Sequence, residues 1–240
     1  AARLGEERAA LQYNLSLSRD GRTLAYREVG ARDMGDLVVM DVASKKTRQL
    51  TTVNPELKQL ALGELKPVSW KSFDGMEIWG LLLTPPGYEG TSKIPLLVYC
   101  HGGPIGGVTL GIFPQFMHVP GQMDPYPTEA FPSAGFAVLF PMPRGGSGYG
   151  EAGHRMIIDD WGGPDYKDIM AGVDHLISRG VADETRLGVM GASYGGYMTN
   201  WIVTQTSRFK AATAGASIAD LTDLYYLTDG GDLMAEYYKL

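Results

Sequence analysis

Hydrophobic and polar residues alternate over short runs in the first part of the chain. Residues 24–29 and 37–42 show the two-residue period that is typical of strands with one buried face. A turn sequence, SRDG at residues 18–21, precedes the first run, and the polar residues 43–47 lead from the second run toward another short strand. The pattern predicts an antiparallel meander.

A linker and a second alternating region follow the meander. Residues 55–66 are predicted to form the linker, with Pro67 marking its end. Residues 76–84 alternate again, after the turn at Asp74-Gly75. We therefore divide the chain into a β-meander with its linker at residues 1–64 and a larger domain at residues 65–240.

Beyond Gly90 the apolar residues form continuous runs, as expected for strands that are buried on both faces. These runs are residues 96–100, 136–140, 187–190 and 211–214. Residues 165–179, between the second and third runs, place five apolar side chains on one helical face, with Pro164 near the start and Gly180 just past the end. Strands that alternate with helices predict an α/β fold with a doubly wound, mostly parallel sheet, which binds ligands beyond the carboxyl ends of its strands.

Composition and charge exclude several classes of protein. The net charge of −6, from 21 basic and 27 acidic residues, argues against nucleic acid as a partner. No apolar run approaches the roughly 18 residues of a membrane span, and residues 1–12 lack the apolar core of a signal peptide, so we expect no membrane partner and favour a cytoplasmic location. Cys100 is the single cysteine, which excludes an internal disulfide and a cysteine-rich zinc site; neither a metal nor a cofactor is predicted.

Glycine is the compositional outlier, with 32 of 240 residues. The glycines cluster at the ends of apolar runs, which indicates tight turns or backbone that approaches a ligand. The cluster at residues 145–150 has the order G-x-x-G-x-G, not the G-x-G-x-x-G of a dinucleotide-binding turn. Nearby, Arg144 is predicted to form an ion pair with Asp159 or Asp160 that braces the loops, and Trp161 to lie in the core.

The sequence GASYGG at residues 191–196 follows the apolar run 187–190 and precedes a predicted helix at residues 197–205. This is the nucleophile elbow G-x-S-x-G in its strand–turn–helix context. The glycines two residues before and after Ser193 remove side chains that would collide as strand and helix cross. Ser193 is therefore the candidate nucleophile.

A serine nucleophile needs hydrogen-bond donors for the oxyanion that develops on the substrate. In this elbow the backbone N–H of Tyr194 supplies one donor, and the loop after an earlier strand supplies another. Here that loop is HGGP at residues 101–104, directly after the run 96–100. Two parts of one active site thus occur in the expected order.

Four motifs together, HGGP, RGGSGYG at residues 144–150, DDWGGPDYKD at residues 159–168 and GASYGGYM at residues 191–198, resemble the prolyl oligopeptidase family of serine peptidases, closest to its acylaminoacyl-peptidase and dipeptidyl-peptidase-like members. The resemblance implies an α/β-hydrolase domain and a meander that is similar to one blade of the preceding β-propeller. It implies that Ser193 is the nucleophile and that the N–H groups of Tyr194 and Gly103 form the oxyanion hole. It further implies an apolar substrate pocket, drawn from Ile218, Leu221, Leu224 and Tyr225.

The expected triad order is serine, acid, histidine, yet no histidine follows Ser193. All four histidines lie upstream: His101, His118, His154 and His175. Acidic residues do follow, at Asp220, Asp223, Asp229 and Asp232, but the family's acid lies further along. We therefore expect a family member that lacks its C-terminal portion, with the triad acid and histidine, and most of its propeller.

Several functional hypotheses remain. One is hydrolysis of peptide or acyl-peptide bonds through a Ser193 acyl-enzyme, and another is esterase activity on small acyl esters at the same site. A third is an inactive fragment that acts only by association. Because an unpaired sheet edge near residues 211–214 invites another chain, we also expect self-association or complementation by the missing C-terminal segment.

Overall fold

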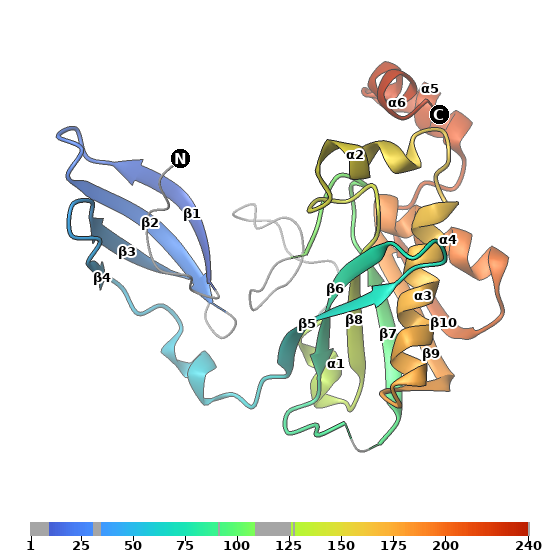
Figure 1. Cartoon of the computed structure of the whole chain (residues 1–240), viewed down its shortest axis with the longest axis horizontal. Helices are drawn as coiled ribbons and strands as arrows, with labels where there is room; N and C mark the ends of the chain where they lie inside the picture. Colours follow the sequence, from blue (N-terminus) through green and yellow to red (C-terminus); the bar gives the residue numbers. More distant parts are fainter. Residues whose placement is uncertain (1–9, 31–34, 91, 109–125, 127, 240) are drawn as a thin grey trace. The chain divides into compact units, whose positions relative to one another are not determined.

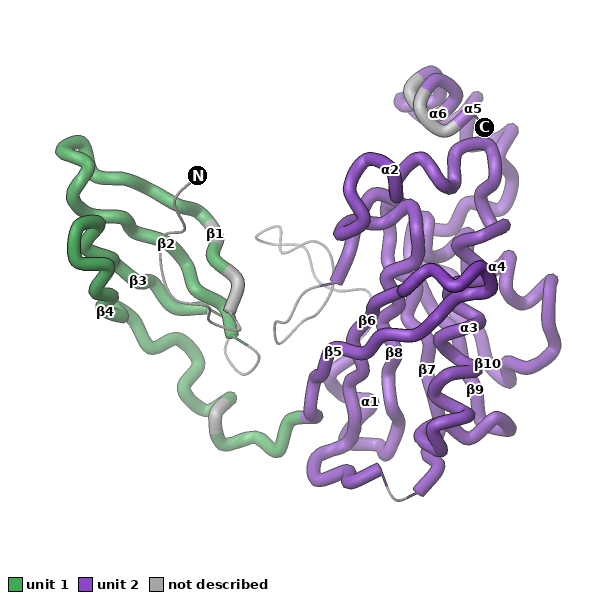
Figure 2. The backbone as a smooth tube through the Cα atoms, in the orientation of Figure 1, with its two compact units in different colours: residues 1–62, 109–114 green, residues 63–108, 115–240 purple. Residues whose placement is uncertain are grey.

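The computed structural model describes residues 10–30, 35–90, 92–108, 126 and 128–239. The chain divides into two compact units, residues 1–62 with 109–114 and residues 63–108 with 115–240 (Figure 2). The boundary lies two residues before the one that the sequence suggests. Among the described residues, every helix is too short or too polar to cross a membrane.

The first unit contains a four-stranded antiparallel sheet. Its strands, in spatial and chain order, are β1 (Ala10–Leu17), β2 (Thr23–Gly30), β3 (Asp36–Asp41) and β4 (Thr47–Gln49) (Figure 1). The alternation predicted for residues 24–29 and 37–42 is confirmed, because Leu24, Tyr26, Val38 and Met40 form a small core on one face.

The predicted linker ends earlier than expected. It contains a short 3₁₀ helix, η1 (Pro55–Gln59), and β5 (Glu64–Lys71) begins before Pro67. The prediction that Pro67 ends the linker is therefore wrong: Pro67 lies within β5, opposite Leu81. A proline is tolerated there because β5 is an edge strand, whose outer side needs no N–H donor.

A six-stranded mixed sheet forms the second unit, in the order β10-β9-β7-β8-β6-β5. The remaining strands are β6 (Glu77–Thr84), β7 (Ile94–Cys100), β8 (Ala137–Met142), β9 (Ala182–Ala192) and β10 (Phe209–Gly215). β10, β9, β7 and β8 are parallel, whereas β6 pairs antiparallel with β8, and β5 pairs antiparallel with β6. The predicted mostly parallel sheet is confirmed.

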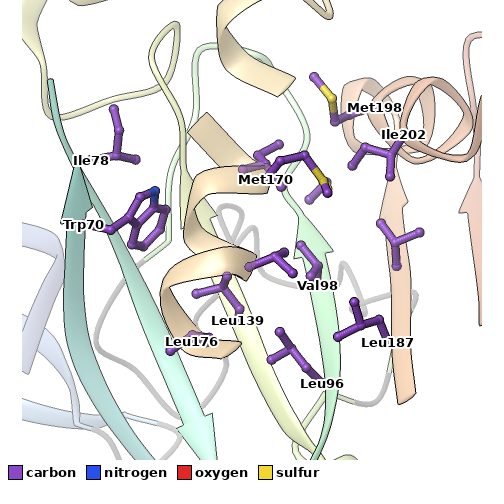
Figure 3. Close-up of a cluster of buried hydrophobic side chains, with 14 of the residues drawn as sticks. Trp70, Ile78, Leu96, Val98, Leu139, Met170, Leu176, Leu187, Met198 and Ile202 are labelled. Atoms are coloured by element: carbon purple, nitrogen blue, oxygen red, sulfur yellow. The ribbon is translucent and has the colours of Figure 1, made fainter. Parts of the chain in front are cut away.

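Two helices cover this sheet and bury its main core. α3 (Pro164–Ser178) packs on β5, β8 and β9, and α4 (Tyr194–Gln205) packs on β7, β9 and β10 (Figure 1). Figure 3 shows apolar side chains between these helices and the strands, among them Leu96, Leu139, Leu176 and Ile202. Burial of each such side chain contributes about 1.5–3 kcal/mol. The core thus fixes the helices against the strand ends.

Shorter helices lie in the connections and after β10. They are α1 (Ala130–Ser133), α2 (Gly150–His154), the 3₁₀ helix η2 (Arg155–Ile157), α5 (Leu221–Leu227) and α6 (Gly231–Tyr238).

Strand β10 differs from the sequence expectation. The run 211–214 was expected to be buried on both faces, but its residues are exposed. The reason is position: among the described strands β10 pairs with β9 alone and forms the other edge of the sheet.

Candidate active site

The two glycine motifs meet at the carboxyl ends of neighbouring strands. β7 and β9 are parallel, and Cys100 at the end of β7 pairs with Gly191 near the end of β9. β8 lies on the other side of β7, so the connections after β7 and β8 lead to opposite sides of that strand. Ligand sites of open α/β sheets form at such a switch point. We call residues 101–104 the HGGP loop and residues 191–196 the elbow.

Ser193 lies exposed at the apex of the elbow, between β9 and α4. Its backbone angles, φ 60° and ψ −123°, are rare for a residue with a side chain and cost on the order of 1–3 kcal/mol. The turn is fixed from both sides, since Ser193 N–H donates to the Gly215 carbonyl (3.0 Å) and the Ser193 carbonyl accepts from Tyr197 N–H (3.0 Å). The strained turn directs the serine away from the sheet.

The elbow glycines are required by close backbone approach. A Cβ atom at Gly191 would lie 2.5 Å from the carbonyl oxygens of both Cys100 and Gly195. At Gly195 a Cβ atom would overlap the Cys100 carbonyl, so the obstacle there is the end of β7 as well as the β9–α4 crossing. At Gly196 it would lie 2.6 Å from the Gly215 carbonyl oxygen of β10. Three strands thus converge on the first turn of α4.

The HGGP loop lies against the serine. A Cβ atom at Gly102 would lie 3.3 Å from the Ala192 carbonyl oxygen and 3.5 Å from Ser193 Cβ. Gly103 is exposed and has φ 136°, a conformation that favours glycine. Tyr194 is the first residue of α4, so its N–H has no acceptor within the helix and lies at the positive end of the helix dipole. Within the described part of the chain, neither the Gly103 nor the Tyr194 N–H donates a hydrogen bond, so both can serve an anion.

No described histidine is bonded to the Ser193 hydroxyl. His101 is buried, and its Nδ1 donates to the Gly102 carbonyl (2.7 Å). Burial lowers the pKa of His101, which favours the neutral ring. His154 Nδ1 lies 2.9 Å from the Gly145 carbonyl oxygen, and His175 lies on α3. His118 lies outside the described residues.

The downstream carboxylates are also engaged elsewhere or exposed. Asp220 caps α5, because its side chain accepts from the N–H groups of Thr222 and Asp223. Asp232 accepts from the Tyr225 hydroxyl (3.2 Å). Asp223 and Asp229 are exposed.

Three of the four predicted pocket residues pack against the main core of the second unit. Ile218, Leu221 and Leu224 are half-buried and pack against the main core, which includes Tyr194 and Met198 of α4. Tyr225 is exposed and instead bonds Asp232 at the start of α6.

Arg144 forms a different ion pair from the predicted one. Its guanidinium donates to Asp168 of α3 (2.8 Å) and to Asp74 in the β5–β6 turn (2.7 Å), so the prediction of Asp159 or Asp160 is wrong. Hydrogen bonding to Arg144 lowers the pKa of Asp74 to about 2. The partners lie 70 and 24 residues away along the chain, which a local motif cannot indicate. The ion pairs join the loop after β8 to the β5–β6 turn and to α3, and Trp161 is buried as predicted.

Two further residues that support the elbow carry no sequence signal. The Tyr126 hydroxyl lies 2.9 Å from the Gly191 carbonyl oxygen and 3.0 Å from that of Thr213, which ties the ends of β9 and β10. Asp165, the second residue of α3, accepts a short hydrogen bond from the Tyr194 hydroxyl. Burial raises the pKa of Asp165 to about 6. The sequence placed Asp165 only at a helix start.

Comparisons with known proteins agree with this geometry. A family model described as the prolyl oligopeptidase family matches residues 123–240. An uncharacterized peptidase, YuxL of Bacillus subtilis, is 34% identical over 195 residues, which are 80% of this chain and 28% of that protein. Dipeptidyl-peptidase 5 of Schizosaccharomyces pombe is 31% identical over 177 residues, 69% of this chain and 24% of that protein.

A solved structure of similar fold is the acylaminoacyl peptidase of Pyrococcus horikoshii, with a TM-score of 0.80 and 28% identity, over 95% of this chain and 34% of that one. The chain therefore spans about a quarter to a third of the length of these proteins. The second unit has the predicted α/β-hydrolase fold. On the family match, the relatives and the shared fold, the second unit carries a prolyl oligopeptidase family domain.

Proposed function

We propose that Ser193 is the nucleophile of a serine peptidase. Its Oγ adds to the carbonyl carbon of a peptide or acyl-peptide bond, the amine leaves with a proton, and water then releases the acid from the Ser193 ester. The observation that carries the proposal is the exposed serine on a strained elbow, with the free N–H groups of Tyr194 and Gly103 beside it. These two donors would bind the oxyanion.

The peptide substrate is supported by the names of the relatives, acylaminoacyl peptidase and dipeptidyl-peptidase. Ile218, Leu221 and Leu224 would form an apolar pocket for the side chain next to the cleaved bond, since all three are half-buried against the core in the segment that follows β10. No described histidine is hydrogen-bonded to Ser193, so the proposal takes its base from outside the described residues.

The test is covalent labelling with a fluorophosphonate probe, read by peptide mass spectrometry. We expect the label on Ser193, none in Ser193→Ala, and full labelling in Ser207→Ala, a matched control at the far, exposed end of α4. Loss of triad partners lowers turnover by about four to six orders of magnitude, so high probe concentrations and long incubations are needed. Labelling of other serines at the same rate as Ser193 would refute the proposal.

The open edge of β10 supports a second part of the proposal, which is association. Residues 210–214 are exposed, carry small side chains and one charge, Lys210, and pair with β9 on one side only. Such an edge accepts a further strand, from a second copy of the chain or from an added segment. Light scattering should show oligomers that Ala212→Lys weakens and the exposed control Gln205→Lys does not; a monodisperse monomer would contradict association.

A further inference from the structure

Three side chains of α4 donate hydrogen bonds to the start of α3 and to the loop before it. They are Tyr194, Tyr197 and Trp201, whose spacing of three and four residues places them on one helical face. The Tyr197 hydroxyl donates to the Trp161 carbonyl (2.9 Å), and Trp201 Nε1 donates to the Gly162 carbonyl (2.7 Å). The Tyr194 hydroxyl is different, because it donates to a side chain, the Asp165 carboxylate.

The contact between Asp165 and Tyr194 is buried, and neighbouring backbone donors and an aromatic ring hold both side chains in place. Asp165 is fully buried and Tyr194 is 2% exposed. The carboxylate also accepts from the N–H groups of Gly162 (3.2 Å) and Tyr166 (2.8 Å). Backbone donors from the loop and from α3 therefore orient it independently of the tyrosine. The Trp161 ring packs edge-on against the Tyr194 ring, with 4.9 Å between centroids.

Burying a carboxylate without a cation is unfavourable, so the position calls for an explanation. The titratable groups that face Asp165 are Tyr194 and Tyr197 of α4 and Cys100 at the end of β7. Attachment of α4 to the loop is already provided by Tyr197 and Trp201. What Asp165 adds is a contact with Tyr194, the first residue of α4, whose backbone N–H is the proposed oxyanion donor beside Ser193.

We propose that Asp165 is a positioning residue: through the Tyr194 hydroxyl, its carboxylate fixes the direction of the Tyr194 backbone N–H toward the oxyanion. This inference rests on the proposed function of Ser193. The ring and the N–H belong to the same residue at the first position of α4, where no intrahelical bond fixes the N–H. A ring held at its hydroxyl end leaves the peptide group little freedom to rotate.

The contact between Asp165 and Tyr194 should depend on pH. The ionised carboxylate accepts from all three donors, whereas a protonated carboxyl gives up part of its acceptor capacity. Because burial raises the pKa of Asp165 to about 6, the hold on Tyr194 should weaken as the pH falls through that value.

The test compares four single variants for their rate of fluorophosphonate labelling. Asp165→Asn replaces the carboxylate by a neutral, weaker acceptor and Tyr194→Phe removes the hydroxyl donor. Both should slow labelling about tenfold, less than the hundredfold or more that follows loss of an oxyanion donor. The matched controls Tyr197→Phe and Trp201→Phe each remove a neighbouring bond of the same helix face and should change the rate less than threefold. The double variant Asp165→Asn/Tyr194→Phe should be no slower than either single one, because both substitutions act on the same contact.

A second readout, the NMR signal of the Tyr194 amide, does not depend on labelling. In the unmodified chain its chemical shift should titrate with a midpoint near pH 6; in Asp165→Asn this titration should vanish, while the amide signal of Val189 in β9 stays unchanged. An absence of labelling with this amide behaviour intact would refute the proposed function but not the positioning role. Equal slowing in all four variants, or an amide that ignores Asp165→Asn, would overturn the positioning role itself.

Discussion

Replacement of Arg144 is the sharpest test of what stabilises the second unit. Arg144 is 6% exposed and its side chain donates to Asp168, which is fully buried, and to Asp74, which faces solvent. Asp168 also accepts from the Ser72 hydroxyl and from the Arg144 backbone N–H. These contacts join the β5–β6 turn, the loop after β8 and the first half of α3.

The expected loss in the free energy of unfolding depends on which charge each substitution leaves buried without a partner. Arg144→Met keeps most of the apolar stem but leaves the Asp168 carboxylate buried without its cation. Removal of one partner of a buried ion pair costs about 3–5 kcal/mol in the free energy of unfolding. Asp74→Ala should cost much less, because Arg144 retains Asp168 and Asp74 is solvent-exposed. Arg144→Met/Asp168→Leu should recover most of the loss, since no isolated charge then remains.

Urea unfolding followed by tryptophan fluorescence measures these differences. All four tryptophans lie in the second unit, so the signal reports that unit alone, and Trp70 itself donates to the Asp168 carbonyl (2.8 Å). If Arg144→Met costs less than about 1 kcal/mol, or costs no more than Asp74→Ala, the reasoning that Asp168 depends on this cation is wrong.

Three further predictions concern the elbow and its support. Gly195→Ala forces a Cβ atom onto the Cys100 carbonyl and should cost about 1–3 kcal/mol, seen as a lower urea midpoint, together with loss of Ser193 labelling. Ser193→Gly relieves the positive φ and should raise the unfolding temperature by the equivalent of about 1 kcal/mol; an unchanged temperature would argue against strain. For Asp165, the raised pKa of about 6 means that the folded state binds the proton more tightly. The contribution of this one group to stability is therefore greatest below about pH 4 and falls by roughly 3 kcal/mol as the pH rises through 6; the difference between the unmodified chain and Asp165→Asn in urea titrations at several pH values should follow this profile.

Local patterns in the sequence predict the parts of the fold that local chemistry determines. The strand–turn–helix around Ser193 was predicted from glycine spacing and apolar runs, because a Cβ atom at Gly191 would meet Gly195 only four residues further along. The contact of Gly195 with the Cys100 carbonyl of β7 joins distant segments and carries no such signal. The helix of residues 165–179 was predicted in the same way, from one apolar face between Pro164 and Gly180, and α3 covers Pro164–Ser178.

The features that were missed depend on the arrangement of distant segments. The exposure of β10 follows from its place at the sheet edge, which the small, apolar composition of residues 211–214 does not encode. Arg144 was assigned a partner about 15 residues away, but the sheet brings it to the β5–β6 turn and to α3. Side-chain periodicity indicates which face of an element is buried, not which element covers it.

The elbow and its buried support share one physical property, since each is unfavourable by itself. Ser193 occupies a rare backbone conformation, and Asp165 is a carboxylate without a cation, on opposite sides of the same residue, Tyr194. Both persist because rigid neighbours leave no alternative: Gly195 lies directly against the end of β7, and Gly196 lies against β10. Because strand packing holds the elbow backbone in this conformation, the backbone need not rearrange when an anion binds. The donors can therefore be oriented before the substrate arrives. We therefore expect substitutions that loosen this packing to reduce Ser193 reactivity before they unfold the domain.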